Sequence, residues 1–230
     1  MNFTVIDFCR MTDYTLLSPT VTMEQTDEFI KQAKKNNFIC TYMYPRFISY
    51  LAKAFEGCDI KVGGAVSFPY GAETTDTKLH QVKEFLRLGA SELDFVMNIN
   101  LFKSGMYDAV LDEIKQIVSI SEGKVTKAII EVGLLTDDEI MKASDLVARS
   151  DATFIKTATG TTGIPTTPHH IQLIKSVVGD KVAIKAAGGV RNLDTVKEML
   201  KLGVTRFGIN KDSALSIITE LSQYRNGIEI

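Results

Sequence analysis

Three lysines lie inside runs of mostly apolar residues that have the length and composition of buried β-strands. They are Lys127 in VTKAIIEV, Lys156 in ATFIKT and Lys185 in VAIKA. Strands that are buried on both faces read as almost continuous apolar runs, so a lysine within one requires an explanation. Because side chains alternate along a strand, Lys156 and Lys185 point away from their immediate apolar neighbours. If those neighbours pack outward against helices, both amines point inward.

Two inward lysines on neighbouring strands predict an amine that reacts with carbonyl groups. At a separation of ~6 Å and an effective dielectric constant of ~20, their repulsion amounts to ~3 kcal/mol, or roughly two pKa units. Burial also disfavours the charged form of an amine. A lysine kept neutral in this way attacks an aldehyde or ketone and forms a Schiff base. The pattern therefore predicts a Schiff-base lysine at one of these two positions.

A carboxylate lies within a further apolar run. Asp94 in ELDFVMN has the same parity as Val96 and Asn98, and it is expected to face the same interior. There it can hold a water molecule, or take and return a proton at the carbon next to an iminium. Lys127 is expected to keep Asp94 ionised as its ion-pair partner. The structural alternative is a buried ion network in which strand lysines reach solvent or pair with Asp94 and Glu131.

Short β-branched runs recur along the chain, each followed by a polar turn and a segment with helical periodicity. Their spacing of about thirty residues is that of one βαβ unit. About eight such repeats predict an α/β protein whose parallel sheet closes into a (β/α)8 TIM barrel, with an open doubly wound sheet as the alternative. The G-x-G-x-x-G turn that usually follows the first strand of such an open sheet is missing. The expected strands are 39–43, 60–67, 92–98, 125–132, 152–157, 182–186 and 205–209, with a weaker one near 11–16.

Capping signals mark the helices between these strands. The composition does not shift along the chain, and no linker interrupts it. We therefore expect residues 1–230 to form a single (β/α)8-barrel domain with a short N-terminal helical extension. The expected caps are Thr136 with Glu139, Thr167 with Pro168, and Asn192, and the expected helix-ending glycines are Gly89 and Gly203.

The composition limits the partners that the protein can have. With a net charge of −2 and a pI near 6.0, no strong field attracts nucleic acid or an anionic membrane. No apolar run approaches the ~18 residues of a membrane span. Cys9, Cys40 and Cys58 are too few and too scattered for a disulfide framework or a zinc site. We expect a cytoplasmic protein that binds neither nucleic acid nor membranes.

Glycine-containing turns follow the last three strands. TATGTTG (157–163) comes after Lys156, AAGGVR (186–191) comes after Lys185, and FGIN (207–210) leads into the final helix. Glycines at such points let backbone N–H groups approach an anion, and a helix N-terminus adds a favourable field. Each turn alone is explained by tight strand-to-helix geometry. Together, at one end of a barrel, they indicate a phosphate site.

These motifs resemble the 2-deoxyribose-5-phosphate aldolase family, a class I aldolase family. The resemblance implies a reversible aldol reaction that needs no cofactor and no metal. It also implies that Lys156 is the Schiff-base lysine, Lys185 the neighbour that lowers its pKa, and Asp94 the carboxylate that relays protons. The segments that carry the resemblance are 13–20, 41–47, 68–78, 92–99, FIKTATG (154–160) and IKAAGGVRN (184–192), together with 127–139.

The resemblance further implies that substrate phosphate is held by backbone groups at Gly160, Gly188, Gly189 and Gly208. The family usually continues with two serines after the last of these glycines, whereas this chain reads GINKDSA (208–214). Asn210 can still donate a hydrogen bond there, and Lys211 would add a positive charge. The acceptor is therefore open: a Schiff-base aldolase for another aldehyde, or a phosphate-binding isomerase or non-lyase barrel, are the alternatives. A homodimer or larger homo-oligomer is compatible with the sequence.

Several conspicuous residues are given no catalytic role. Cys40 is expected to be a small core residue. His169 and His170 have no ligand set around them in the sequence. Tyr42 is expected to pack at the barrel entrance, together with Tyr44 and Phe47, and Arg191 is expected to contact an anion.

Overall fold

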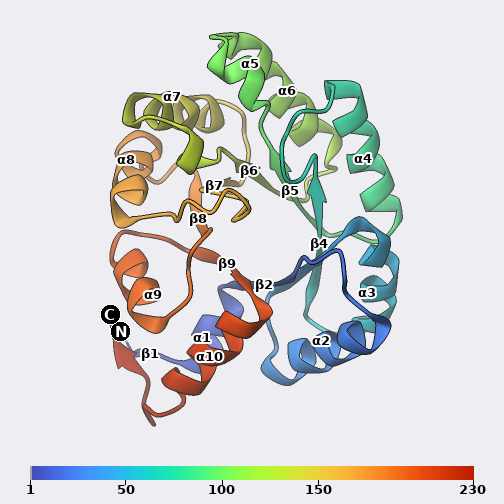
Figure 1. Cartoon of the computed structure of the whole chain (residues 1–230), viewed down its shortest axis with the longest axis vertical. Coiled ribbons are helices and arrows are strands. Elements are labelled where there is room, and N and C mark those ends of the chain that lie inside the picture. The colour runs from blue at the N-terminus through green and yellow to red at the C-terminus, as the bar shows by residue number, and fades with distance from the viewer. Residues whose placement is uncertain (1) are drawn as a thin grey trace.

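The protein is a closed barrel of eight parallel strands surrounded by helices, described here for residues 2–230 of a computed structural model (Figure 1). Each strand pairs with its neighbours in chain order, and β9 closes the barrel by pairing with β2. The fold is therefore the predicted (β/α)8 TIM barrel. The strands are β2 (Thr12–Leu16), β3 (Cys40–Met43), β4 (Lys61–Val66), β5 (Glu92–Val96), β6 (Val125–Ile129), β7 (Phe154–Lys156), β8 (Ala183–Ala187) and β9 (Arg206–Asn210).

The helices form a ring outside the strands (Figure 1). Before the barrel come a two-residue strand and the short helix α1, which is the predicted N-terminal extension; that strand pairs antiparallel with the last one, β10 (Ile228–Glu229). The short strand is β1 (Asn2–Phe3), and the helices are α1 (Val5–Arg10), α2 (Met23–Asn36), α3 (Ile48–Ala54), α4 (Thr75–Arg87), α5 (Ile99–Lys103), α6 (Tyr107–Ile120), α7 (Asp137–Ala148), α8 (Pro168–Val178), α9 (Leu193–Lys201) and α10 (Lys211–Leu221), with the 3₁₀ turns Pro45–Phe47 and Val132–Leu134.

All eight predicted strands are present, and two of them end two or three residues earlier than the apolar runs do. The strand predicted at 92–98 ends at Val96, because Asn98 caps α5 and accepts from the backbone N–H of Leu101. The strand predicted at 125–132 ends at Ile129, because Glu131 adopts a left-handed conformation and begins a 3₁₀ turn. A continuous apolar run thus marks burial beyond the last ladder residue.

The predicted helix caps are confirmed. Thr136 and Thr167 each form a capping box, and the side chain of Asn192 accepts from the third backbone N–H of α9. Gly89 and Gly203 have positive φ angles just beyond the ends of α4 and α9. These helix ends are therefore formed by the residue types that the geometry of a helix end favours.

Strand alternation divides the interior into two parts. Outward side chains pack against the helices, and among them Tyr14 of β2 stacks between Phe29 and Phe38 at centroid distances of 4.6 and 4.3 Å. Inward side chains form a smaller cluster that includes Cys40 and Tyr42. Polar and charged groups can therefore gather inside the barrel without interrupting the outer apolar layer.

The three cysteines differ in exposure. Cys9 and Cys40 are buried, whereas Cys58 is exposed in the turn that enters the amino end of β4. None of the helices within residues 2–230 combines the length and the apolar character needed to cross a membrane.

Candidate active site

A layer of charged side chains fills the barrel interior. Each comes from an inward position of a strand, and none is more than 7% exposed. Because the strands converge on one axis, these groups lie within ion-pair distance of one another. The layer consists of the cations Lys127, Lys156, Lys185 and Arg206 and the carboxylates Asp13, Glu92 and Asp94.

The structure brings together the three residues on which the expected chemistry depends. Lys156 of β7 and Lys185 of β8 lie opposite each other in the register of the two strands. Both donate to the same oxygen of Asp94, Oδ2, at 2.8 and 2.5 Å. The two nitrogens are therefore closer than the ~6 Å expected from strand spacing.

Lys127 connects the rest of the layer. It lies opposite Asp94 in the register of β5 and β6, and its Nζ is 3.2 Å from Oδ1 of Asp94. It also lies 2.5 Å from Glu92 and 3.3 Å from Asp13. Burial lowers the pKa of Lys127, but the charges of these carboxylates outweigh burial and raise the pKa above its usual value. Lys127 is therefore a permanent cation, as expected for the ion-pair partner of Asp94.

Lys156 has the opposite character. Burial lowers the pKa of Lys156 to about 8; Asp94 opposes this shift, and the positive charge of Lys185 adds to it. Burial is thus a larger cause than the repulsion by Lys185. Roughly a tenth of the molecules carry a neutral amine near pH 7.

The number of charges in the layer also favours a neutral Lys156. Without Lys156, three cations face three carboxylates. A protonated Lys156 is a fourth buried cation, and an uncompensated buried charge is unfavourable. When Lys156 loses its proton the layer becomes electrically balanced.

Asp94 stays ionised throughout. Burial raises the pKa of Asp94, but the charges of Lys127, Lys156 and Lys185 outweigh burial and hold the pKa well below its usual range. The carboxylate is therefore an acceptor on both oxygens at neutral pH.

A cavity of about 210 Å³ opens at the carboxyl ends of the strands, next to Lys156. The Nζ of Lys156 lies 5.9 Å from the ring centre of Phe68, which forms part of the wall. Asp94 and Lys185, each 1% exposed, lie behind Lys156 and do not line the cavity. The predicted binding residues Gly160, Gly188, Gly189, Gly208 and Asn210 all line it, as do Thr15, Tyr44, Thr159, Thr161 and Arg191.

The glycines of the cavity rim are required by the backbone. Gly160, Gly188 and Gly189 have φ angles of +85°, +82° and +91°, a region that L side chains rarely adopt. A Cβ atom on Gly188 would also lie 2.9 Å from the Cβ atom of Ala158. The two turns therefore approach each other closely, and this approach leaves the rim formed by backbone.

Threonines fix these turns relative to the strands. The hydroxyl of Thr157 donates to the carbonyl of Ala187 at 2.8 Å, and the hydroxyl of Thr166 donates to the same carbonyl at 2.6 Å. The backbone N–H of Thr159 donates to the carboxylate of Glu131 at 3.0 Å. The turn that follows β7 is thus anchored to Glu131, just beyond β6, and to Ala187 at the end of β8.

Residues 9–209 match the family model described as DeoC/LacD family aldolase. The chain belongs to the DeoC/LacD family of aldolases. It is 41% identical over 203 residues to a deoxyribose-phosphate aldolase of Staphylococcus saprophyticus, and the match covers 88% of this chain and 92% of that protein.

Solved aldolase structures have the same fold. An aldolase named QR15 is 32% identical, with a TM-score of 0.89 over 96% of this chain and 98% of that one. The deoxyribose phosphate aldolase from Aeropyrum pernix, described as having a unique tetrameric structure, is 26% identical, with a TM-score of 0.87 over 95% and 92% of the two chains.

The turn at 208–214 differs from the sequence-based expectation for this aldolase. The side chain of Asn210 lines the cavity but is engaged in capping α10: its Oδ1 accepts from the backbone N–H of Ser213 at 3.0 Å. Lys211 does not line the cavity, and its Nζ lies 2.9 Å from Asp212. Besides Lys156, a positive charge at the cavity comes from Arg191, which forms no salt bridge within the part of the chain that the structure describes.

The placement predicted for Tyr42 is wrong. The side chain lies inside the aldolase barrel, 2% exposed, and its hydroxyl donates to Oδ1 of Asp94 at 2.6 Å. Sequence reasoning also missed Asp13, Glu92 and Arg206, which complete the charged layer. Their charge within strand runs was a signal, but each lies at or next to the first residue of its strand, where a polar residue is also compatible with a turn.

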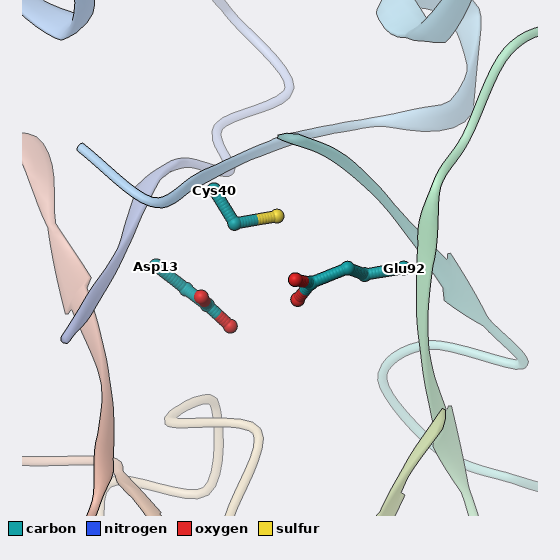
Figure 2. A group of neighbouring side chains, drawn as sticks. All are labelled: Asp13, Cys40 and Glu92. Atoms are coloured by element: carbon teal, nitrogen blue, oxygen red, sulfur yellow. The ribbon is translucent and has the colours of Figure 1, made fainter. Parts of the chain in front are cut away.

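Cys40 is buried as predicted, next to two carboxylates. Figure 2 shows Asp13, Cys40 and Glu92 pointing toward one another, and their possible ligand atoms lie within 4.8 Å of each other. The carboxylates are already paired with Lys127 and Arg206. Burial raises the pKa of the Cys40 thiol well above its usual value, so it stays protonated. In this aldolase, lysine and arginine side chains of the same chain therefore neutralise the two carboxylates of the cluster.

Proposed function

We propose that this aldolase reversibly cleaves 2-deoxyribose 5-phosphate to acetaldehyde and glyceraldehyde 3-phosphate through a Schiff base on Lys156. The observation that carries the proposal is the environment of Lys156: it borders the cavity, its pKa is lowered to about 8, and it shares Asp94 with a second lysine. The deoxyribose-phosphate aldolase of Staphylococcus saprophyticus, at 41% identity, supports this choice of substrate.

In the cleavage direction, the neutral amine of Lys156 attacks the aldehyde carbon of the open-chain sugar. Water leaves and an iminium forms, which carries the same positive charge as the protonated amine. A base then removes the proton of the C3 hydroxyl, and the C2–C3 bond breaks. Its electron pair forms the double bond of an enamine, while C3 becomes the aldehyde carbon of glyceraldehyde 3-phosphate. Protonation of the enamine at C2 and hydrolysis release acetaldehyde and restore Lys156.

Asp94 and Lys185 support these steps from behind the nucleophile. Asp94 is ionised and lies 2.8 Å from the reacting nitrogen, so it stabilises the iminium and moves protons at the adjacent carbon, directly or through a water molecule. Lys185 keeps one oxygen of Asp94 engaged and disfavours protonation of Lys156. An isomerase that works by a carboxylate base needs neither lysine, so it is not supported.

We place the substrate phosphate at the glycine turns of the cavity. The turns that carry Gly160 and Gly189 present backbone there, and Arg191 adds a positive charge. This arrangement favours a phosphorylated aldehyde over an uncharged one. Arg191→Ala is expected to raise KM for glyceraldehyde 3-phosphate by about five- to fiftyfold, and to leave KM for unphosphorylated glyceraldehyde nearly unchanged. Equal handling of both aldehydes by wild type and variant would indicate a Schiff-base aldolase with another acceptor.

Reductive trapping tests the proposal. Borohydride in the presence of acetaldehyde should add one two-carbon group to the protein, and peptide mapping should locate it on Lys156. Lys156→Met is the matched control and should remain unlabelled. An adduct on Lys185 with Lys156 unmodified would reverse the assignment of the two lysines, and the lack of any adduct in the folded wild type would remove the Schiff-base mechanism.

The similar aldolases also bear on the oligomeric state. We propose a homo-oligomer, because the Aeropyrum pernix aldolase, at 26% identity, is described as a tetramer. Light scattering of the purified chain gives its mass in solution, and a monomer at micromolar concentration would contradict the proposal.

A further inference from the structure

Tyr42 occupies a position that the surrounding strands leave open for it. It lies opposite Gly63 in the register of β3 and β4. A Cβ atom on Gly63 would lie 2.0 Å from Cζ of Tyr42, so no larger residue fits at that position while the ring stays in place. The inward position of the Tyr42 ring on β3 therefore depends on the glycine at position 63 of β4.

The hydroxyl of Tyr42 links two members of the charged layer. It donates to Oδ1 of Asp94 at 2.6 Å and accepts from Nζ of Lys127 at 2.8 Å. Burial raises the pKa of Tyr42 well above its usual value, and the negative charge of Asp94 raises it further. The phenol therefore remains protonated and a hydrogen-bond donor at neutral pH.

This hydrogen bond separates the two oxygens of Asp94 by role. Oδ1 is held by Tyr42 and lies 3.2 Å from Lys127, whereas Oδ2 accepts from Lys156 and Lys185. Lys127 is shared with Glu92 and Asp13, so its hold on Asp94 is divided. Loss of the phenol donor would leave Oδ1 held by Lys127 alone, so the carboxylate would be less firmly fixed about its terminal bond, which has a broad torsional minimum.

We infer that Tyr42 is a positioning residue, which fixes Asp94 so that Oδ2 faces the carbon next to the iminium on Lys156. The inference rests on the proposed Schiff-base function. Tyr42 does not border the cavity and does not touch substrate. Its hydroxyl bonds to Asp94 and Lys127 and makes no hydrogen bond to Lys156 among the described residues, so its effect is expected at proton transfer to and from carbon.

Tyr42→Phe separates the two steps. The ring and its packing stay, and only the hydroxyl is removed, with its hydrogen bonds to Asp94 and Lys127. Borohydride trapping of acetaldehyde on Lys156 should stay within about twofold of wild type. Exchange of the acetaldehyde methyl protons with deuterium, followed by NMR in D₂O, reports enamine formation and should slow by about ten- to a hundredfold, within the usual contribution of acid–base catalysis. KM for the aldehyde should not change, whereas kcat should fall with the exchange rate.

Gly63→Ala is the second variant. The methyl group displaces the ring while the hydroxyl is retained, so the same split between trapping and exchange is expected. In the double variant with Tyr42→Phe, the exchange rate should equal that of the slower single variant, since both changes remove one contact. Thermal unfolding monitored by circular dichroism verifies that each variant is folded. If Gly63→Ala does not fold, the result for Tyr42→Phe alone tests the inference.

The outcomes distinguish the two proposals. A wild type that neither traps nor exchanges acetaldehyde contradicts the proposed function itself. A wild type that does both, with Tyr42→Phe exchanging at the same rate, overturns the inference about Tyr42. Equal loss of trapping and exchange in Tyr42→Phe also overturns it, because that result indicates a general structural role.

Discussion

Two buried lysines in this aldolase have similar burial and different consequences. Lys78 on α4 lies between the barrel and α6, is 0% exposed, and donates to Glu113 at 2.6 Å and to the carbonyl of Val96 at 3.0 Å. Lys156 inside the barrel is 7% exposed and donates to Asp94 at 2.8 Å. Burial lowers the pKa of both amines, and a carboxylate opposes the shift in each case.

The two lysines differ in two respects. One is the number of cations that share the partner carboxylate, and the other is the access of solvent to the amine. Glu113 has one cation, so Lys78 and Glu113 form a closed pair. Asp94 faces three lysines, and Lys156 is the one that borders a cavity. A buried lysine becomes a candidate nucleophile when its counter-charge is already engaged and a substrate can reach it.

The largest effect is expected from removing the two amines one at a time. Lys156→Met should abolish labelling by acetaldehyde and borohydride and reduce kcat/KM on the order of 10⁴-fold or more, because the covalent step is lost. Lys78→Met should retain kcat/KM within about fivefold at a temperature where it is folded. A steady-state assay of glyceraldehyde 3-phosphate release measures both. Comparable losses in the two variants would mean that charge sharing does not separate a nucleophile from a structural lysine.

For the free energy of unfolding, Lys78→Met should have the larger effect and Lys156→Met the smaller one. Lys78→Met leaves Glu113 buried without a cation and should lower the free energy of unfolding by about 3–5 kcal/mol. Combining it with Glu113→Leu should recover most of this loss, since an apolar pair replaces an ion pair. Lys156→Met leaves three cations facing three carboxylates and should be neutral or stabilising. Urea unfolding compares all three, and a strongly destabilised Lys156→Met would contradict the charge balance inferred for the barrel interior.

The pH dependence of trapping on Lys156 should show the effect of the second lysine that shares Asp94. The neutral amine is reactive, so below about pH 8 trapping on Lys156 should fall roughly tenfold per pH unit, with a plateau above it. In Lys185→Met one positive neighbour is removed, so the pKa of Lys156 should rise and the profile should move to alkaline pH by about one unit. Initial trapping rates between pH 6 and pH 10 test this. An unmoved profile would leave burial as the sole cause.

The smallest effect is expected at a half-buried lysine outside the cavity. Lys211 lies outside the cavity and pairs with Asp212, which is 84% exposed at its side chain. Lys211→Ala should change KM for the phosphorylated aldehyde by less than about twofold and stability by less than about 1 kcal/mol. A KM increase comparable to that of Arg191→Ala would return Lys211 to the phosphate site suggested by the sequence.

Alternation along strands made the centre of the site predictable. Lys156, Lys185 and Asp94 are charged residues in the middle or at the carboxyl ends of apolar runs, and a period of two assigns all three to one face. The number and spacing of the runs predicted the barrel for the same reason, because each run must be buried on both sides.

The rest of the site depends on barrel closure, which no local pattern contains. Tyr42 is an ordinary strand residue by propensity, and only the register of β3 and β4 shows that it needs Gly63. Asp13 and Arg206 are 193 positions apart in sequence and meet because β2 and β9 pair. Lys78 lies in a polar helical segment and has no sequence signal of burial. Its partner Glu113 belongs to another helix.

The exposed thiol of Cys58 has a practical consequence. It lies at the amino end of β4, whereas the cavity opens at the carboxyl ends of the strands. Cys9 and Cys40 are 0% exposed, so a maleimide reagent should form one thioether per native chain. Molecules tethered to a solid support through Cys58 would all present the cavity to the solution. A fluorescent dye at the same atom would report tumbling or assembly without obstructing substrate entry.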